Sequence, residues 1–343
     1  MKIASNTGFV PALADYAHGI PMLRQAGFDC FDLSICCQID TDGYFEGAEG
    51  EARAKEVRRI ADACGMVCNQ SHAPYPTSHL NDTPEHIARN QALPEKIRRA
   101  MEIAAIVGAK AIVVHPQQHL RWADCAEALK EQNLAFYESL LPLCRAYNIR
   151  VAVENMWQRN RFGRSIVDSV CSTPREFLDY MEMLDSEWFV ACLDIGHCTV
   201  TNHRPEDLIR TLGKKHLHVL HIHDTDGKAE LHTLPFQSTA TDWEAVTDAL
   251  AEIGYEGELT LEADNFHGRI PAGLLQPTLN YMASVARYLA DATERKKQAL
   301  KDAGVGQREG SGLCIFCKEP KMPVRSNATA GLKPYLYAKG LHD

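Results

Sequence analysis

Side chains that can bind a metal ion recur along the chain, each near the end of a short apolar run. They are His72 in SHAPY, His115 in VVHP, Glu154 in VAVENMW, Asp194 and His197 in CLDIGH, His221 and His223 in LHIHD, and Glu262 in TLEAD. Carboxylates brought together in an apolar setting suffer desolvation and mutual repulsion, and a bound cation relieves both. Three carboxylates with one imidazole suit one divalent ion, namely Mn, Mg, Co or Zn, with open positions for water and substrate.

The elements that must position these residues are eight short runs rich in Val, Ile, Leu and Phe. They span residues 2–5, 30–35, 67–71, 111–115, 150–155, 190–194, 217–223 and 259–262. Amphipathic stretches lie between them, at 50–64, 85–107, 123–147, 174–184, 205–212 and 242–253. Strands that alternate with helices are typical of parallel βα units. Eight units predict an α/β fold of the (β/α)8 TIM barrel type, whose active site lies at the C-terminal ends of the strands.

The barrel is expected to occupy residues 1–292 and a C-terminal extension residues 293–343. The composition changes there to ERKKQALKDAGVGQREGSG, which is charged and then rich in glycine. The second half of this tail carries Leu313, Phe316 and Tyr335 among other apolar residues, and is too apolar for a free disordered segment. We expect it to pack on the barrel or on a neighbouring subunit, which favours a homo-oligomer and leaves a different partner subunit open. Cys314 and Cys317 form a lone CxxC pair, for which ordinary thiols are the favoured interpretation.

The overall charge restricts the class of partner. The formal net charge is −9, which argues against nucleic acid or an anionic membrane as the main partner, because both favour basic surfaces. No run of about 18 apolar residues is present and the N-terminus lacks the apolar core of a signal peptide. We therefore expect a cytoplasmic protein whose twelve scattered cysteines are free thiols.

The ordered motifs resemble those of the xylose-isomerase-like TIM barrel superfamily, in particular its sugar phosphate isomerase/epimerase family. The similar segments are HAPY at His72, VENM at Glu154, CLDIGH at Asp194, HIHD at His221 and GYEGELTLE ending at Glu262, and they span roughly residues 2–290. The resemblance implies that Glu154, Asp194, His221 and Glu262 bind the metal. It also implies that Glu154 and Glu262 are the catalytic acid/base pair.

Strand parity alone leaves two candidate ligands on the seventh strand, since His221 and His223 can both point inward. The resemblance selects His221 and leaves His223 to contact the substrate or a ligand. His197 matches a position that contacts substrate oxygens, and His232 matches the histidine before a glycine-rich LPLGEG segment. Here that segment reads LPFQSTATDW, so this loop and its substrate contacts should differ. The remaining substrate-binding candidates are His72, His115, Trp157 and Arg159, the last two being equally well explained as surface residues.

The predicted function is metal-dependent isomerisation or epimerisation of a sugar, a sugar phosphate or a related polyol ketone. A glutamate would remove a proton beside the carbonyl, the cation would stabilise the enediolate, and the other glutamate would return the proton. A lyase on the same scaffold, either a dehydratase or a C-glycoside-cleaving β-elimination enzyme, would use the same enolate. A barrel that has lost activity and serves as a binding subunit is opposed by the retention of all four expected ligands.

A zinc phosphodiesterase of the endonuclease IV type is a further alternative. Such an enzyme binds three zinc ions, and the additional ligands would be His72, His115, His197, Glu230 and His232. The acidic charge, the absence of an ETTAG-like segment after Glu154 and the missing glycines after His232 oppose this alternative.

Overall fold

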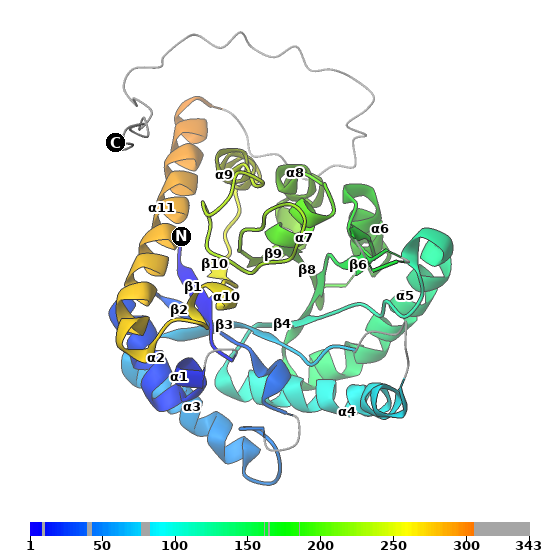
Figure 1. Cartoon of the computed structure of the whole chain (residues 1–343), viewed down its shortest axis with the longest axis horizontal. Helices are drawn as coiled ribbons and strands as arrows, with labels where there is room; N and C mark the ends of the chain where they lie inside the picture. The colour runs from blue at the N-terminus through cyan, green and yellow to red at the C-terminus, as the bar shows by residue number, and fades with distance from the viewer. Residues whose placement is uncertain are drawn as a thin grey trace, which may run out of the picture. The chain divides into compact units, whose positions relative to one another are not determined.

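Eight parallel strands form a nearly closed barrel in the computed structural model, which describes residues 1–8, 11–39, 43–76, 83–160, 162–163, 165–184 and 186–304. The strand order is β10-β1-β2-β3-β4-β5-β8-β9, and a parallel bridge between Ile222 and Leu261 joins the two ends of the sheet. Figure 1 shows the strands at the centre with the helices around them. The predicted (β/α)8 fold is confirmed.

The eight expected strands are all present, with ends that differ from the expected ones by at most two residues. They are β1 (Ile3–Asn6), β2 (Cys30–Leu33), β3 (Val67–His72), β4 (Ala111–Val114), β5 (Arg150–Glu154), β8 (Phe189–Asp194), β9 (Leu217–His221) and β10 (Leu259–Leu261). The segment after Glu154, for which no element was predicted, forms the antiparallel hairpin of β6 (Trp157–Arg159) and β7 (Ile166–Asp168).

The helices surround the barrel and bury one apolar face each. They are α1 (Pro11–Ala14), α2 (Tyr16–Ala26), α3 (Gly50–Cys64), α4 (Pro84–Val107), α5 (Trp122–Tyr147), α6 (Pro174–Leu184), α7 (Ile195–Val200), α8 (Pro205–His216), α9 (Trp243–Glu252), α10 (Asp264–His267) and α11 (Ala272–Asp302), with a 3-10 turn at Ile35–Cys37. In α6 the buried residues Phe177, Tyr180, Met181 and Leu184 recur every three or four positions, as an amphipathic helix requires. Gly65 ends α3 with φ of 64°, a left-handed conformation that glycine adopts without steric cost.

Two apolar layers lie on either side of the strands. The larger one joins the outer faces of the strands to the helices. The smaller one fills the barrel interior and consists of Ala111, Val113, Ala152, Val190, Cys192 and Val219. Side chains on one face of a strand recur every second residue, so these inward positions lead to His115, Glu154, Asp194 and His221. The polar residues at the strand ends are therefore the uppermost inward positions of the same strands.

The last helix continues past residue 292, where the barrel was expected to end, as far as Asp302. The charged stretch after residue 292 is amphipathic: Thr293 and Lys297 are buried, and the ammonium of Lys297 donates a hydrogen bond to the backbone oxygen of Tyr255. The division into a barrel and a tail stays a prediction. Cys314, Cys317 and everything after residue 304 lie outside the described residues.

The state of the cysteines and the presence of membrane spans can be examined in the described residues. Their cysteines, among them Cys30, Cys68, Cys144 and Cys192, are free thiols. None of the helices in this part of the chain combines the length and the hydropathy that a membrane span needs.

Candidate metal centre

Four side chains from four strand ends converge inside the barrel. Glu154 ends β5, Asp194 ends β8, His221 ends β9, and Glu262 directly follows β10. One oxygen or nitrogen of each lies within 4.8 Å of those of the other three, and all four side chains are buried. These are the four metal ligands that the resemblance implies, and the fold brings them together.

His221 lies among the three carboxylates. Its Nδ1 atom is 3.0 Å from Glu154 Oε1, 3.1 Å from Glu262 Oε2 and 4.0 Å from Asp194 Oδ2. Burial disfavours the charged form of this imidazole, but its neighbours, Cys192 and the two glutamates, outweigh burial and raise its pKa well above the usual range. Burial likewise opposes ionisation of Glu154 and Glu262, yet His221 and neighbouring histidines hold the pKa of both carboxyls below its usual value.

This donor set fits a divalent cation. A single N–H at His221 Nδ1 cannot hydrogen bond well to three surrounding carboxylates at once, so the negative charge of the group exceeds what one proton can neutralise. Carboxylate oxygens with one imidazole nitrogen are ligands that Mn²⁺, Mg²⁺, Co²⁺ and Zn²⁺ accept. Glu154, Asp194, His221 and Glu262 are therefore the residues that would hold such an ion.

Asp194 also shapes the segment that follows it. One of its oxygens accepts a 2.6 Å hydrogen bond from the backbone N–H of His197 at the start of α7, and the other lies 3.0 Å from His223 Nε2. Gly196 lies so close to the ring of His223 that a Cβ would overlap it, which explains the glycine of the CLDIGH motif. His223 thus contacts Asp194 and stands outside the four-residue group.

A second cluster adjoins Glu154 on its other side. The Nε2 atoms of His72 and His115 are 3.1 Å apart, and they lie 3.7 Å and 2.8 Å from Glu154 Oε2. For both histidines burial opposes protonation. Contacts with Glu154 outweigh it at His72 and raise that pKa, whereas the pKa of His115 is lowered.

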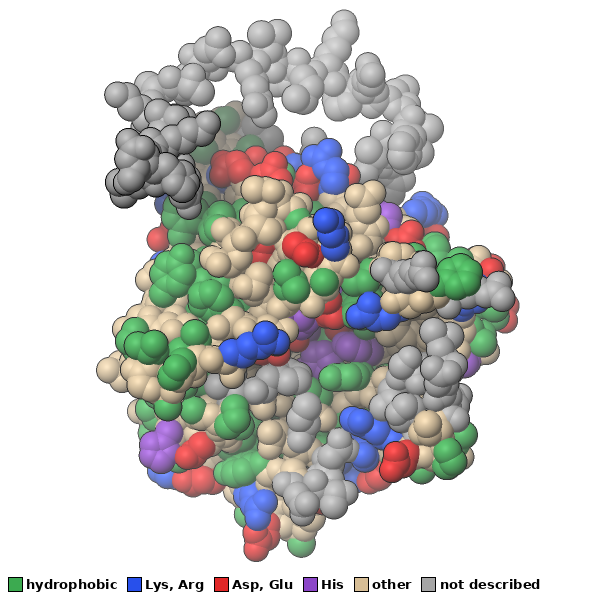
Figure 2. Space-filling model, viewed as in Figure 1, with side chains coloured by type: hydrophobic (Ala, Val, Ile, Leu, Met, Phe, Trp, Pro, Cys, Tyr) green, Lys and Arg blue, Asp and Glu red, His purple; other side chains and the backbone are tan. Residues whose placement is uncertain are grey.

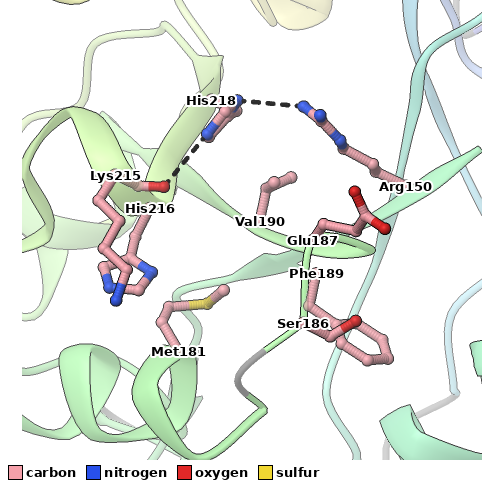
Figure 3. Close-up of a pocket in the computed structure, with 9 residues that line it drawn as sticks. All are labelled: Arg150, Met181, Ser186, Glu187, Phe189, Val190, Lys215, His216 and His218. Atoms are coloured by element: carbon pink, nitrogen blue, oxygen red, sulfur yellow. Dashed lines mark hydrogen bonds between the residues drawn. The ribbon is translucent and has the colours of Figure 1, made fainter.

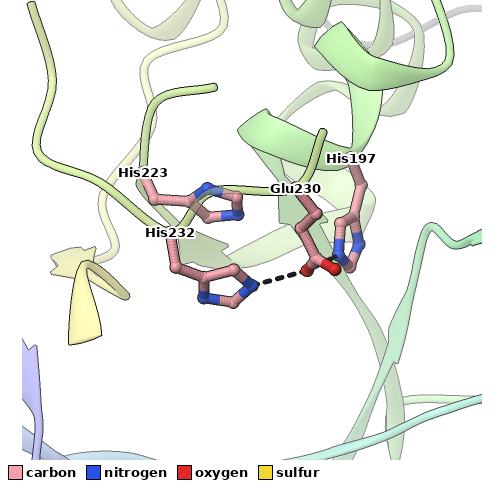
Figure 4. A group of neighbouring side chains, drawn as sticks. All are labelled: His197, His223, Glu230 and His232. Carbon is pink, nitrogen blue, oxygen red and sulfur yellow. Dashed lines mark hydrogen bonds and ion pairs between the residues drawn. The ribbon is translucent and has the colours of Figure 1, made fainter. Parts of the chain in front are cut away.

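A third cluster consists of His197, His223, Glu230 and His232 (Figure 4). Glu230 Oε1 lies 2.9 Å from His197 Nε2 and 2.5 Å from His232 Nε2, and the rings of His223 and His232 stack with centroids 4.2 Å apart. Burial disfavours a charge on His197, but Asp194, Glu230 and Glu154 outweigh it and raise its pKa to about 10. The carboxylate of Glu230 is partly exposed, so this cluster lies nearer the surface than the first.

Three residues that the sequence analysis did not select also support the centre. Asp32, on β2, is buried with Oδ2 at 3.8 Å from His221 Nε2. Asn155 binds the backbone of Asp194 in both directions, accepting from its N–H at 2.7 Å and donating to its oxygen at 3.0 Å. Asp264 lies 3.0 Å from His232 Nδ1. A polar residue inside an apolar run, as in CFDL, was the signal available for Asp32.

The hairpin β6–β7 lies beside the third cluster. The indole of Trp157 meets the ring of His197 edge to face, with centroids 6.4 Å apart, and the guanidinium of Arg159 lies 5.6 Å from the indole centroid. Figure 2 shows histidine side chains gathered in the hollow of this face, with Lys and Arg side chains to either side.

A separate pocket of about 300 Å³ opens where β5, β8 and β9 begin (Figure 3). It is lined by Arg150, Glu187, Lys215 and His218 among others, and none of the expected site residues belongs to it. The N-terminal ends of barrel strands usually serve stability and not catalysis, so we keep the candidate site at the opposite end.

Comparisons with known proteins agree with this architecture. Three solved structures illustrate the likeness: a D-tagatose 3-epimerase-like protein, at 19% identity over 88% of this chain and 100% of that chain with a TM-score of 0.65; an L-ribulose 3-epimerase, at 16% over 90% and 99% with a TM-score of 0.62; and the apo 3-keto-D-glucoside 4-epimerase of E. coli, at 17% over 83% and 99% with a TM-score of 0.61. At these identities the likeness shows the fold. No curated protein matches the sequence significantly.

The sequence profile of one family covers most of the chain. The profile of the xylose isomerase-like TIM barrel matches residues 20–303, a range that includes every residue of the three clusters. The chain therefore belongs to the xylose isomerase-like TIM barrel family.

Proposed function

We propose that the protein is a divalent-metal-dependent isomerase or epimerase that moves a proton beside the carbonyl of a sugar, a sugar phosphate or a related polyol ketone. The observation that carries this proposal is the meeting of Glu154, Asp194, His221 and Glu262 within 4.8 Å at the C-terminal ends of the barrel strands. The names of the structural neighbours, which include sugar 3-epimerases, support the same reaction class.

Glu154 and Glu262 have the roles of proton acceptor and proton donor. They come from different sides of the barrel, since β8 and β9 lie between β5 and β10 in one direction and β1 to β4 in the other. The carboxylate that removes the proton must be ionised, and the one that delivers a proton to the opposite face must be protonated when the reaction begins. A carboxylate on each side of a substrate carbon can remove a proton from one face and deliver one to the other. A bound divalent ion would supply positive charge to the developing enediolate, worth several kcal/mol.

The histidines around the centre have polar atoms available for substrate hydroxyls. His72, His115, His197, His223 and His232 all belong to clusters that adjoin the four-residue group. Their pairing with Glu154, Asp194 and Glu230 orients the rings. A polyol can exchange its hydroxyl hydrogen bonds with such imidazoles, which fits a sugar better than an apolar ketone.

The test is hydrogen exchange in D₂O with Mn²⁺ present. Ketoses and ketose phosphates are incubated with the protein, and deuterium at the carbon beside the carbonyl is measured by NMR. Incorporation that disappears with a chelator supports the proposal. A product that has lost water or an aglycone would move the assignment to a lyase that uses the same enolate. Failure of every ketose to exchange would overturn the isomerase and epimerase assignment.

A zinc phosphodiesterase is a second candidate, and one observation favours it. The five additional ligands that it needs lie in the two clusters next to the four-residue group: His72 and His115 with Glu154, and His197 and His232 with Glu230. Against it stand the net charge of −9 and the LPFQSTATDW segment. Metal analysis separates the two functions, because three tightly bound zinc ions per chain with cleavage of a phosphodiester would favour this candidate, and one divalent ion would favour the first.

A further inference from the structure

The hairpin β6–β7 is fixed to the barrel and does not behave as a free loop. Strand side chains alternate between faces, so Trp157 and Arg159 share one face and Gln158 points the other way. The amide of Gln158 donates to the backbone oxygens of Gln118 and Leu120, at 3.1 Å and 2.8 Å, and accepts from the backbone N–H of Trp122 at 3.0 Å. Gln158 thereby anchors one face of β6 to the segment after β4. This anchor also fixes the position of the opposite face, which carries Trp157 and Arg159.

The free face of β6 is directed toward the candidate site. The indole of Trp157 contacts the ring of His197, and the guanidinium of Arg159 lies against that indole. Arg159 is exposed and forms no ion pair with any carboxylate of the described residues. Arginines on the outer helices differ, since Arg53, Arg58 and Arg98 each pair with a carboxylate one turn away.

The charge of the hairpin is opposite to that of the site beneath it. Residues 157–168 read WQRNRFGRSIVD, with three arginines and one acidic residue, in a chain that carries 45 acidic and 36 basic residues. The carboxylate of that acidic residue, Asp168, lies 2.7 Å from His203 Nε2; the placement of Arg161 and Arg164 lies outside the described residues. The carboxylates of Glu154, Asp194, Glu262 and Glu230 would repel an anionic ligand. The exposed guanidinium of Arg159, against the indole that meets the ring of His197, offsets that repulsion at one end of the ligand.

We infer that the substrate of this site carries an anionic group, a phosphate ester or a carboxylate, which the guanidinium of Arg159 binds beside the indole of Trp157. This inference rests on the proposed function for the ketose part of the substrate. A planar guanidinium offers parallel N–H donors that match both kinds of anion. The indole keeps the guanidinium pointing along the face of the hairpin by a cation–π contact, so less conformational entropy is lost on binding.

The experiment measures binding by calorimetry in the presence of Mn²⁺, with three ketoses that differ at one end: D-fructose, D-fructose 6-phosphate and D-fructuronate. The wild-type protein is compared with Arg159→Gln and with Arg59→Gln as a matched control. Arg59 is an exposed residue of α3 paired with Glu56, so its replacement changes the net charge equally at a distance from the site. We expect the phosphate or the carboxylate ketose to bind more tightly than fructose.

In Arg159→Gln this preference should fall roughly 10- to 100-fold, as expected for loss of a hydrogen bond to a charged group, whereas Arg59→Gln should keep it. Arg159→Lys should restore part of it. Which ketose loses affinity identifies the anionic group. Equal binding of the neutral and anionic ketoses, or an anion preference that Arg159→Gln leaves intact, would overturn the inference. Deuterium exchange measured on the same samples tests the proposed function separately, since Arg159-dependent binding without exchange would refute only that function.

Discussion

The Nε2 atom of His221 lies 3.8 Å from Oδ2 of Asp32, a residue buried on a neighbouring part of the barrel. Among the described residues, neither His221 Nε2 nor the other oxygen of Asp32 has a hydrogen-bond partner. If Nδ1 binds a metal ion, the proton of the neutral imidazole must sit on Nε2, where the carboxylate of Asp32 attracts it. Asp32 would then fix the ring of His221 as carboxylates behind metal-binding histidines commonly do.

We therefore predict that Asp32→Asn lowers Mn²⁺ affinity about 10- to 100-fold, measured by calorimetry. Burial raises the pKa of the Asp32 carboxyl. Above the usual carboxyl pKa, ionised Asp32 therefore lowers the stability of the folded protein. Asparagine removes this penalty, so the metal-free variant should unfold at a higher temperature near pH 7. Asp62→Asn on the exposed face of α3 is the matched control. A variant that loses stability and keeps its Mn²⁺ affinity would assign Asp32 a purely structural role.

Glu154→Gln and Glu262→Gln should each reduce deuterium exchange into a ketose by roughly 100- to 10,000-fold, the usual contribution of a general acid or base. Each change removes a group that transfers a proton and one negative charge from the metal site. Circular dichroism should show a folded barrel, because the interior apolar layer lies below these residues. Glu56→Gln, on the surface of α3, should exchange normally. Near-normal exchange in either site variant would contradict the two-glutamate mechanism.

The strands and the inward residues at their ends were predictable from sequence because both depend on local patterns. Short apolar runs gave the positions of β2 to β5, and alternation placed His115, Glu154 and Asp194 on the inner side of their strands. The resemblance chose His221 over His223, and this choice stays a prediction. In the fold His221 lies among the three carboxylates, whereas His223 turns toward Asp194 and packs against Gly196.

Other features depend on contacts between distant parts of the chain, which no local pattern contains. The hairpin β6–β7 is short and polar, and it is held by Gln158 to residues some forty positions earlier. The end of α11 reads as a charged tail, and contacts with distant residues, among them the bonds from Lys297 to Tyr255 and from Lys296 to Thr247, show that it packs on the barrel. Asp32 lies in an apolar strand and acquires its role from His221, which is far away in sequence.

His221→Ala should lose Mn²⁺ affinity to a much greater extent than His223→Ala. His221 Nδ1 lies within 4.0 Å of all three carboxylates, whereas His223 contacts Asp194 alone among them. Removing His221 deletes a donor, and removing His223 leaves the donor set complete while loosening one oxygen of Asp194. Titration of both variants with Mn²⁺ by electron paramagnetic resonance measures the difference. A greater loss in His223→Ala would transfer the ligand role to that residue.

Metal affinity should rise with pH. The carboxylates around His221 raise its pKa well above the usual value, so in the metal-free protein the ring is protonated near neutral pH, and the proton must leave before Nδ1 can bind a metal. Each proton released changes the apparent affinity by about tenfold per pH unit below that pKa. Calorimetry in buffers of different ionisation enthalpy counts the protons. An affinity that does not change between pH 6 and pH 8 would show that metal binding releases no proton from His221, and would contradict this prediction.

Glu176 on α6 provides a stability prediction outside the candidate site. Its Oε1 atom accepts a 2.8 Å hydrogen bond from the indole of Trp122, and its Oε2 atom is buried without a hydrogen-bond partner in the described part of the chain. Burial raises the pKa of this carboxyl from 4.5 to about 7. For an acid with a raised folded-state pKa, the ionised form destabilises the protein, so the penalty is absent below pH 4.5 and is complete above pH 7.

Glu176→Gln keeps an oxygen for Trp122 and removes the charge. The shift in pKa corresponds to at most about 3 kcal/mol, so we predict that the variant raises the free energy of unfolding by up to about 3 kcal/mol at pH 8 and has little effect at pH 4. Urea denaturation at the two pH values measures this difference, and the Mn²⁺ affinity of the variant serves as a control that the centre is intact. Equal effects at both pH values would mean that the substitution acts through packing, because only an ionisation penalty grows as the pH rises through the carboxyl pKa.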